Sequence, residues 1–260
     1  MLNLITHDIT SGPASGATIH EIQLARPPVN ALNLAMLQAL RVALQDSVER
    51  GARGIVLSGA PGLFSAGADV PALLQLDRAG VLAFWREFFA VCGALAGSPI
   101  PVVASITGHS PAGGAVLSLF CDYRVMAEGM FKIGLNEVRV GLAVPENIQL
   151  ALRRIVGAYR AERLLVSGSM LTAAEALAIG LVDDTTNVDQ VTTRSLFWMN
   201  ELLALPSEAM LATRAIARAD LVAAYADLDR LPLEGFVEGF YRPQTQAVLQ
   251  QLVARLKDKG

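Results

Sequence analysis

A stretch without any Asp, Glu, Lys or Arg runs from residue 101 to residue 120, which is the length of one membrane span. Its middle is the run Gly-His-Ser-Pro-Ala-Gly-Gly at 108–114. A helix facing lipid would leave backbone groups unpaired around this proline and these glycines. The stretch therefore predicts a buried strand at 101–107, a tight turn and a buried helix at 113–120, in a chain that does not span a membrane.

The rest of the chain alternates strands and helices in its first half and is mainly helical after residue 145. Short apolar runs bounded by turn residues predict strands at 18–26, 54–59, 123–127 and 131–134. Apolar residues at steps of three and four predict helices at 33–50 and, with one break, at 69–97. This order predicts an α/β core with a helical extension, and we place the core at 1–205 and the helical part at 206–260.

The helical part carries apolar residues at heptad-like spacing, namely Val237, Phe240, Val248, Leu252 and Leu256. A face of this kind packs on the chain's own core or on a neighbouring subunit. The sequence does not choose between the two.

Composition excludes several classes of protein. The chain is 53% hydrophobic and 17% charged, which is too apolar for disorder and too poor in charge for a coiled coil. Its net charge of −3 provides no basic field for nucleic acid or an acidic membrane. The 2 cysteines and 3 histidines lack zinc-ligand spacing, so no metal site is expected. The first residues show no basic-then-apolar run, so a secretory signal is not expected either.

Three loops hold the candidate functional residues. The first, 62–69, is rich in small residues, whose backbone N–H groups a ligand can approach, and it ends at Asp69, a predicted helix N-cap. The second, 108–114, opens a helix, and the free N–H groups and dipole of a helix N-terminus suit an anionic oxygen. The third, 133–145, contains a single acid, Glu137.

Glu137 has two interpretations. In apolar surroundings the pKa of its carboxyl group rises, which makes it a stronger proton acceptor and then a usable proton donor. Alternatively, it is a surface carboxylate paired with Arg139, two residues further along. Taken alone, the segment favours the surface pair.

The second loop also approaches the hydrolase nucleophile elbow G-x-S-x-G, with Ser110 in place of the nucleophile. In that elbow the residue after the serine donates its N–H to the oxyanion, and here it is Pro111, which has none. Ala112 also replaces the last glycine. The sequence therefore argues against a serine hydrolase, and we interpret His109 as a packed or solvent-facing ring rather than a base.

Four runs of residues, in their order and spacing, carry a family resemblance: LARPPVNAL at 24–32, FSAGAD at 64–69, PAGG through CDYR at 111–124, and AEAL with GLV at 174–182. They resemble the crotonase (enoyl-CoA hydratase/isomerase) superfamily over most of the chain. The resemblance implies an α/β fold, a spiral of ββα units with a helical C-terminal extension. It also implies a homotrimer or a dimer of trimers.

By this resemblance, the backbone N–H groups of Ala68 and Gly113 form an oxyanion hole for the carbonyl of an acyl-CoA thioester, with Ala66 and Gly114 at the substrate. CoA carries phosphates, and Arg26 and Lys132 are candidates, from their positions alone, to contact them. No cofactor is implied, because CoA is part of the substrate, and neither nucleic acid nor a membrane is an expected partner. The expected location is the cytoplasm for a bacterial protein, with the mitochondrial matrix open for a eukaryotic one.

Hydratases of the superfamily hold the attacking water with two glutamates, and this chain has Val116 at the first position and Glu137 at the second. One glutamate is enough to move a double bond, by taking a proton from C2 of a 3-enoyl thioester and returning it at C4. The runs 110–114, 121–124 and 134–137, and the basic end 255–260, are similar to mitochondrial-type enoyl-CoA delta isomerases. The prediction is therefore an isomerase of fatty-acid breakdown with Glu137 as its base and acid. A hydratase, another crotonase reaction and a non-catalytic acyl-CoA binder are the alternatives.

The aromatic run 84–89 is a candidate wall of the acyl pocket. Aromatic residues at helical spacing are more typical of a core. We therefore leave this run out of the predicted site.

Overall fold

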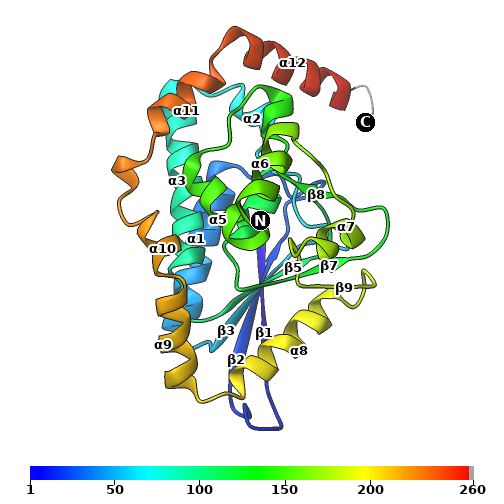
Figure 1. Cartoon of the computed structure of the whole chain (residues 1–260), viewed down its shortest axis with the longest axis vertical. Coiled ribbons are helices and arrows are strands. Elements are labelled where there is room, and N and C mark those ends of the chain that lie inside the picture. The colour runs from blue at the N-terminus through cyan, green and yellow to red at the C-terminus, as the bar shows by residue number, and fades with distance from the viewer. Residues whose placement is uncertain (258–260) are drawn as a thin grey trace.

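The computed structural model describes residues 1–257, and the side chains of residues 1–255. At its centre is a six-stranded sheet in the order β1-β2-β3-β5-β7-β9 (Figure 1). Its strands are β1 (Leu2–Asp8), β2 (Thr18–Leu24), β3 (Gly54–Ser58), β5 (Val102–Ile106), β7 (Tyr123–Ala127) and β9 (Asp184–Thr186). Only the β1–β2 pair is antiparallel. Both β3 and β5 are buried along their whole length, because helices cover the two faces of a parallel sheet.

Three short strands form a second sheet in the order β4-β6-β8. They are β4 (Gly62–Leu63), β6 (Gly108–Pro111) and β8 (Ile133–Gly134). Each follows a strand of the large sheet and leads toward a helical segment, which confirms the expected α/β spiral of ββα units with a helical end. Gly62 and Gly108 face each other in register, and a Cβ atom on Gly108 would lie 1.9 Å from the Gly62 carbonyl carbon, so only glycine permits this pairing.

Helices cover both faces of the large sheet, and others form an outer layer. The helices of the described chain are α1 (Leu34–Glu49), α2 (Val70–Leu73), α3 (Arg78–Ala96), α4 (Gly113–Leu119), α5 (Glu146–Val156), α6 (Ala158–Ser167), α7 (Ala173–Ala178), α8 (Val191–Leu203), α9 (Ser207–Ala217), α10 (Ala219–Ala223), α11 (Leu233–Phe240) and α12 (Pro243–Lys257), with 3-10 helices η1 (Glu137–Val140) and η2 (Leu228–Arg230). In Figure 1, α1 and α3 lie together to the left of the sheet. Helix α8 packs on β3, β5 and β7 from the other side.

The uncharged stretch 101–120 forms the predicted strand and helix, β5 and α4, but the short strand β6 occupies the segment predicted to be a tight turn. Within the described residues, one helix is long and apolar enough to cross a membrane, α3. Its side chains Phe84, Phe88 and Phe89 belong to the hydrophobic core, which makes it a core helix.

The sequence missed four strands. The edge strand β1 is mostly exposed and therefore lacks the apolar alternation that predicts a strand. The segment after residue 145 was predicted to be nearly all helical. It contains the polar three-residue strand β9, which pairs with β7 at the edge of the sheet. The remaining two, β4 and β6, lie inside predicted loops and are too short to show a period.

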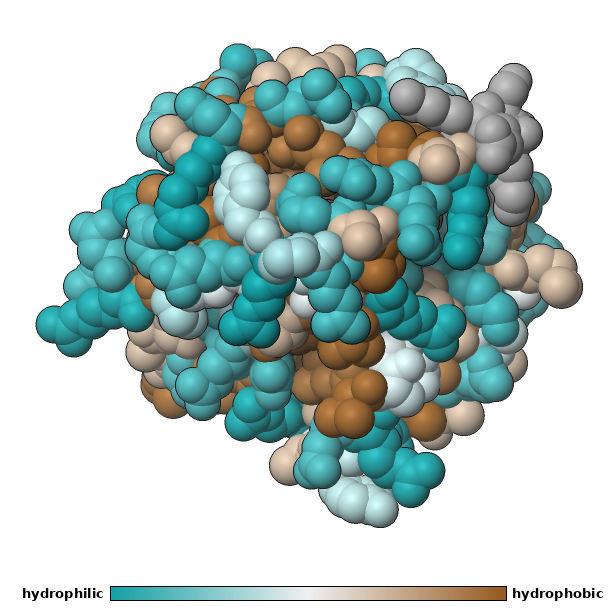
Figure 2. Space-filling model, turned by 90° about the horizontal axis from the view of Figure 1, so that it is seen from above, coloured by the Kyte–Doolittle hydropathy of each residue, from teal (hydrophilic) through white to brown (hydrophobic). Residues whose placement is uncertain are grey.

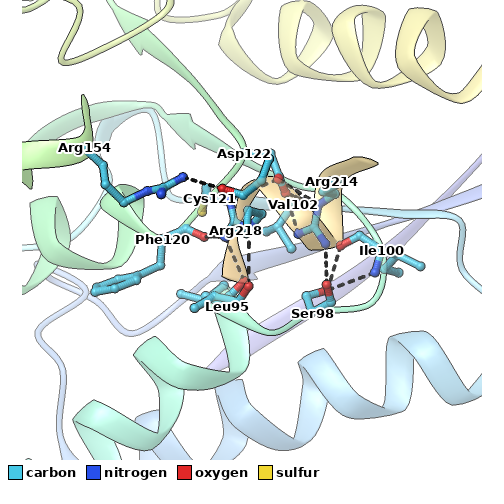
Figure 3. A network of polar contacts seen from close by, with 12 residues as sticks. Leu95, Ser98, Ile100, Val102, Phe120, Cys121, Asp122, Arg154, Arg214 and Arg218 are labelled. Carbon is cyan, nitrogen blue, oxygen red and sulfur yellow. Dashed lines mark hydrogen bonds and ion pairs between the residues drawn. The ribbon is translucent and has the colours of Figure 1, made fainter. Parts of the chain in front are cut away.

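A buried network ties the C-terminal helices to the core (Figure 3). The carboxylate of Asp122 accepts from Nε and Nη2 of Arg214, at 2.8 and 2.9 Å, and from Nη1 of Arg218, at 3.1 Å. Arg218 also donates to the carbonyl groups of Phe120 and Ala96, at the ends of α4 and α3. These carbonyls lack partners within their own helices, so an arginine there caps two helices at once.

The apolar residues of the helical part pack largely on the chain's own core, where Val237 and Phe240 are fully buried. Val248 and Leu252 are half-buried. The side chain of Leu256 and the end of the basic segment 255–260 lie outside the described residues. Our division of the chain at residue 205 stays a prediction.

Candidate active site

A cavity of about 500 Å³ lies where the three predicted loops meet. Its wall comes from the loops before α2 and α4, from η1, from α3, and from the C-terminal helices α11 and α12. Figure 2 shows the face that carries α11 and α12, where apolar side chains gather in patches among hydrophilic ones. The cavity brings together Arg26, Ala66, Ala68, Gly113 and Glu137 of the predicted site.

The first loop places one residue with a free N–H group, Ala68, in the wall of this cavity. Leu32 forms a parallel bridge with Ala68, in which Leu32 N donates to Gly67 O and Asp69 N donates to Leu32 O, both at 2.8 Å. In such a bridge, successive residues direct their N–H groups to opposite sides. The Ala68 N–H therefore has no protein acceptor among the described residues, and Ala68 lines the cavity.

Within the run 24–32, Asn30 connects this segment to the first loop by hydrogen bonds. Its backbone is left-handed, with φ +47°, a conformation that asparagine tolerates. Its side chain accepts from Arg26 N at 2.8 Å and donates to Phe64 O at 3.1 Å. The hydroxyl of Ser65 donates to Asn30 O at 2.7 Å. These bonds fix the first loop beside the cavity.

The second loop supplies the other free N–H group. Gly113 begins α4, so its N–H has no partner within the helix, and within the described part of the chain it donates to no acceptor. The turn before it is strained, because Ala112 has φ +46° and ψ −120°, a conformation that costs on the order of 1–3 kcal/mol for a residue with a Cβ atom. Ala112 N donates to Gly134 O at 2.8 Å, which holds this turn on β8.

The hydrolase interpretation does not fit this geometry. Ser110 is fully buried and does not line the cavity. His109 is exposed, its ring meets Phe131 edge-on, and its Nδ1 accepts from the backbone N–H of Lys132. It is the packed, solvent-facing ring that the sequence predicted.

Glu137 begins η1 and turns its carboxyl group toward the interior. Atom Oε2 is buried and has no hydrogen-bond partner among the described residues. Burial raises the pKa of this carboxyl group from its usual 4.5 to about 7, because the charged form loses its hydration. Arg139 is exposed and forms no ion pair with the buried Glu137 carboxyl group, so the surface-pair interpretation is wrong.

Two other side chains make Glu137 chemically isolated. Val116, on α4, is buried and lines the same cavity. Asp69 is the other acid in the wall, but its Oδ2 lies 2.7 Å from Nη2 of Arg26 and its Oδ1 caps α2 by accepting from Ala72 N. Among the described lining residues, Glu137 is thus the one carboxyl group without an ion-pair partner, and its Oε2 accepts no hydrogen bond.

The remaining predicted residues take different positions. Arg26 lines the cavity, but its guanidinium also donates to Ala31 O at 2.8 Å besides pairing with Asp69, and a contact with CoA phosphate stays a prediction. Ala66 lines the cavity, whereas Gly114 does not. A Cβ atom on Gly114 would lie 2.7 Å from Ser65 O, so this glycine allows α4 to pack against the first loop.

One wall of the cavity is aromatic, which the sequence did not predict. Trp85, Phe88 and Phe89 on α3 and Phe236 and Phe240 on α11 all line the cavity. The rings of Trp85 and Phe236 meet edge-on, with centroids 4.5 Å apart. The run 84–89 indicated these aromatic residues, but aromatic residues of a core and of a cavity wall have the same helical spacing.

Within the described residues, no cluster of His, Cys, Asp and Glu able to hold a metal ion occurs.

Fold and cavity together are those of a crotonase-type enzyme, and comparison with known proteins agrees. The sequence model of the enoyl-CoA hydratase/isomerase family matches residues 14–235, and the chain belongs to that family. Human mitochondrial enoyl-CoA delta isomerase 1 is 31% identical over 250 residues, which cover 95% of this chain and 83% of that protein. A probable enoyl-CoA hydratase of Mycobacterium avium is 32% identical over 218 residues, which cover 82% and 83%.

A solved structure extends the likeness to the whole fold. The crystal structure of human mitochondrial delta3-delta2-enoyl-CoA isomerase matches with a TM-score of 0.90 and 29% identity, over 99% of this chain and 98% of that one. The chain is therefore an enzyme of the enoyl-CoA hydratase/isomerase family with the crotonase fold, whose relatives carry both isomerase and hydratase names.

Proposed function

We propose that this protein is an enoyl-CoA isomerase, which moves the double bond of a 3-enoyl-CoA thioester to the 2-position. The observation that carries the proposal is the isolation of Glu137. It is an unpaired carboxyl group in an apolar cavity, and the wall has Val116 where a second water-holding glutamate would stand. The isomerase names among the relatives support the same choice.

In the proposed reaction, the thioester oxygen accepts hydrogen bonds from Ala68 N–H and Gly113 N–H. The Glu137 carboxylate takes a proton from C2, and the electron pair left behind spreads over the diene and the thioester oxygen as a dienolate. The resulting carboxylic acid returns the proton to C4. The product is the 2-enoyl thioester, and Glu137 is a carboxylate again.

Hydration differs from this reaction in its need for a held water molecule. One carboxyl group beside a buried valine gives that water few hydrogen-bond partners. Purified protein given cis- or trans-3-enoyl-CoA should form 2-enoyl-CoA, and given crotonyl-CoA it should add little water. Faster hydration than isomerisation would make the protein a hydratase. Saturable acyl-CoA binding without proton exchange at C2 would make it a binding protein.

The pH dependence of isomerisation should report Glu137. The free enzyme must hold this group as a carboxylate to accept a proton, and burial raises its pKa to about 7. We expect kcat/KM to rise about tenfold per pH unit below that value and to level off above it. Initial rates across the pH range check this, with circular dichroism as the control for unfolding. If kcat/KM instead levelled off near the ordinary carboxyl pKa, the result would contradict a base whose pKa is raised by burial.

Val116→Glu should introduce water addition. The new carboxyl group would stand in the wall of the cavity that Glu137 also lines, which provides a second partner for water. We expect crotonyl-CoA hydration to rise by about a hundredfold, within the range of one acid–base group. Val116→Gln has nearly the same size without the ionisable group and is the matched control. Equal hydration by both variants would contradict the explanation.

The substrate in this proposal is an acyl-CoA thioester, and no separate cofactor takes part because CoA is a portion of the substrate. Assembly as a homotrimer or a dimer of trimers stays a prediction from the family. So does a location in the cytoplasm of a bacterium or in the mitochondrial matrix.

A further inference from the structure

Helix α12 reaches both halves of the catalytic cavity. It lies over α2, which follows the loop of Ala68 (Figure 1), and it also packs on η1, which begins with Glu137. Its side chains Leu249 and Leu252 line the cavity. A helix that begins more than 100 residues after Glu137 in the sequence therefore bears on the segment that carries the acid.

One polar contact joins α12 to this segment. The side chain of Thr245 is 1% exposed, and its hydroxyl donates to the carbonyl oxygen of Gly141 at 3.1 Å. Gly141 ends η1 in the left-handed conformation, with φ +81°. A Cβ atom there would lie 2.9 Å from the Thr245 oxygen, so the two segments meet as closely as a glycine permits.

The same peptide is bonded to Glu137. Leu142 N donates to Glu137 O at 3.1 Å, and Gly141 N donates to Val138 O at 3.2 Å. The Gly141–Leu142 peptide is thus held by Thr245 through its carbonyl group and by Glu137 through its N–H group. A shift of α12 would move the backbone from which the Glu137 side chain projects.

We propose that Thr245 is a positioning residue for Glu137, whose hydroxyl holds the Gly141 carbonyl and thereby fixes the turn that carries the acid. The inference rests on the proposed function of Glu137. Because proton transfer requires the carboxyl oxygen within hydrogen-bond reach of the substrate carbon, a loosened turn lowers the rate of proton transfer more than it weakens substrate binding.

Thr245→Val tests this with little change in shape, because valine replaces the hydroxyl by a methyl group. We expect kcat for 3-enoyl-CoA to fall about tenfold, which corresponds to ~1.4 kcal/mol. KM should stay within about twofold, since the apolar face of α12 still packs on the cavity. Thr245→Ser keeps the hydroxyl and should restore kcat. Gln244→Ala, an exposed change one residue away, is the matched control and should behave as wild type.

Amide hydrogen exchange gives a readout that does not depend on activity. The Leu142 N–H, which donates to Glu137 O, should exchange about tenfold faster in Thr245→Val than in wild type and in Thr245→Ser. A wild-type kcat in Thr245→Val, unchanged protection of this amide, or a loss that serine does not rescue would each overturn the inference. Full activity of Glu137→Gln would instead overturn the proposed function, so the two failures are distinguishable.

Discussion

Replacing Glu137 by glutamine should lower kcat for isomerisation of 3-enoyl-CoA by about a thousandfold, within the range that a general acid–base group supplies. Glutamine has the same shape but cannot accept the C2 proton. Binding of a saturated acyl-CoA should change by less than about threefold, because the N–H groups of Ala68 and Gly113 and the aromatic wall remain. Formation of 2-enoyl-CoA and solvent-deuterium exchange at C2 measure the first effect, and calorimetric titration measures the second. Retention of most of the activity would contradict the mechanism.

The same variant should be more stable than wild type in alkaline solution. Burial raises the pKa of Glu137 to about 7, so the folded state holds this proton more tightly than the unfolded state does. The stability from protonated Glu137 is fully present below about 4.5 and is lost as pH rises through 7. At pH 8 the neutral glutamine should add up to about 3 kcal/mol, and below pH 5 close to nothing. Thermal unfolding at the two pH values shows whether the variant folds and whether its stability relative to wild type changes in the expected direction.

Gly67→Ala should lower kcat by about a hundredfold, as expected when one of the two proposed oxyanion donors is displaced. Gly67 has φ +83°, and a Cβ atom there would lie 3.1 Å from Gly113 N and 3.2 Å from Pro111 O. The new methyl group would press the two loops apart and separate the N–H groups of Ala68 and Gly113. Steady-state kinetics on 3-enoyl-CoA measures the loss.

Gly16→Ala is the matched control for this variant. Gly16 has a similar φ, +85°, and an added Cβ atom would meet nothing within 4 Å. It carries the same backbone strain on the loop between β1 and β2, and we expect wild-type kcat. If Gly67→Ala and Gly16→Ala lose activity equally, strain rather than the oxyanion geometry is the cause.

The parts of the site that the sequence predicted are those set by local backbone chemistry. Small residues at 62–69 and 108–114 predicted loops with accessible N–H groups, and these loops line the cavity. Asp69 was predicted as a helix N-cap, and it caps α2. Pro111 argued against a nucleophile elbow, and the adjacent Ser110 is buried away from the cavity. Each conclusion follows from one segment and its own hydrogen-bonding groups.

The aromatic wall and the contact of Thr245 could not be predicted in this way. Trp85 and Phe236 are far apart in the sequence and meet only because α11 packs on α3. Helical spacing shows that such residues are buried, not whether they face a core or a cavity. The hydroxyl of Thr245 has no local partner that would distinguish it from other threonines in helices.

The state of Glu137 divides the two kinds of information most clearly. The sequence by itself supplied a lone acid at 137 and a valine at 116. These two residues, with the family resemblance, led to the proposal of isomerisation over hydration. Taken alone, the segment around Glu137 favoured a surface ion pair with Arg139. Only the tertiary structure places the Glu137 carboxyl group in an apolar cavity. It also pairs the other acid of the cavity wall, Asp69, with Arg26. The physical reason is that a pKa depends on the removal of water, and the segments that remove it here, from α3, α4 and α12, lie far from Glu137 in the chain.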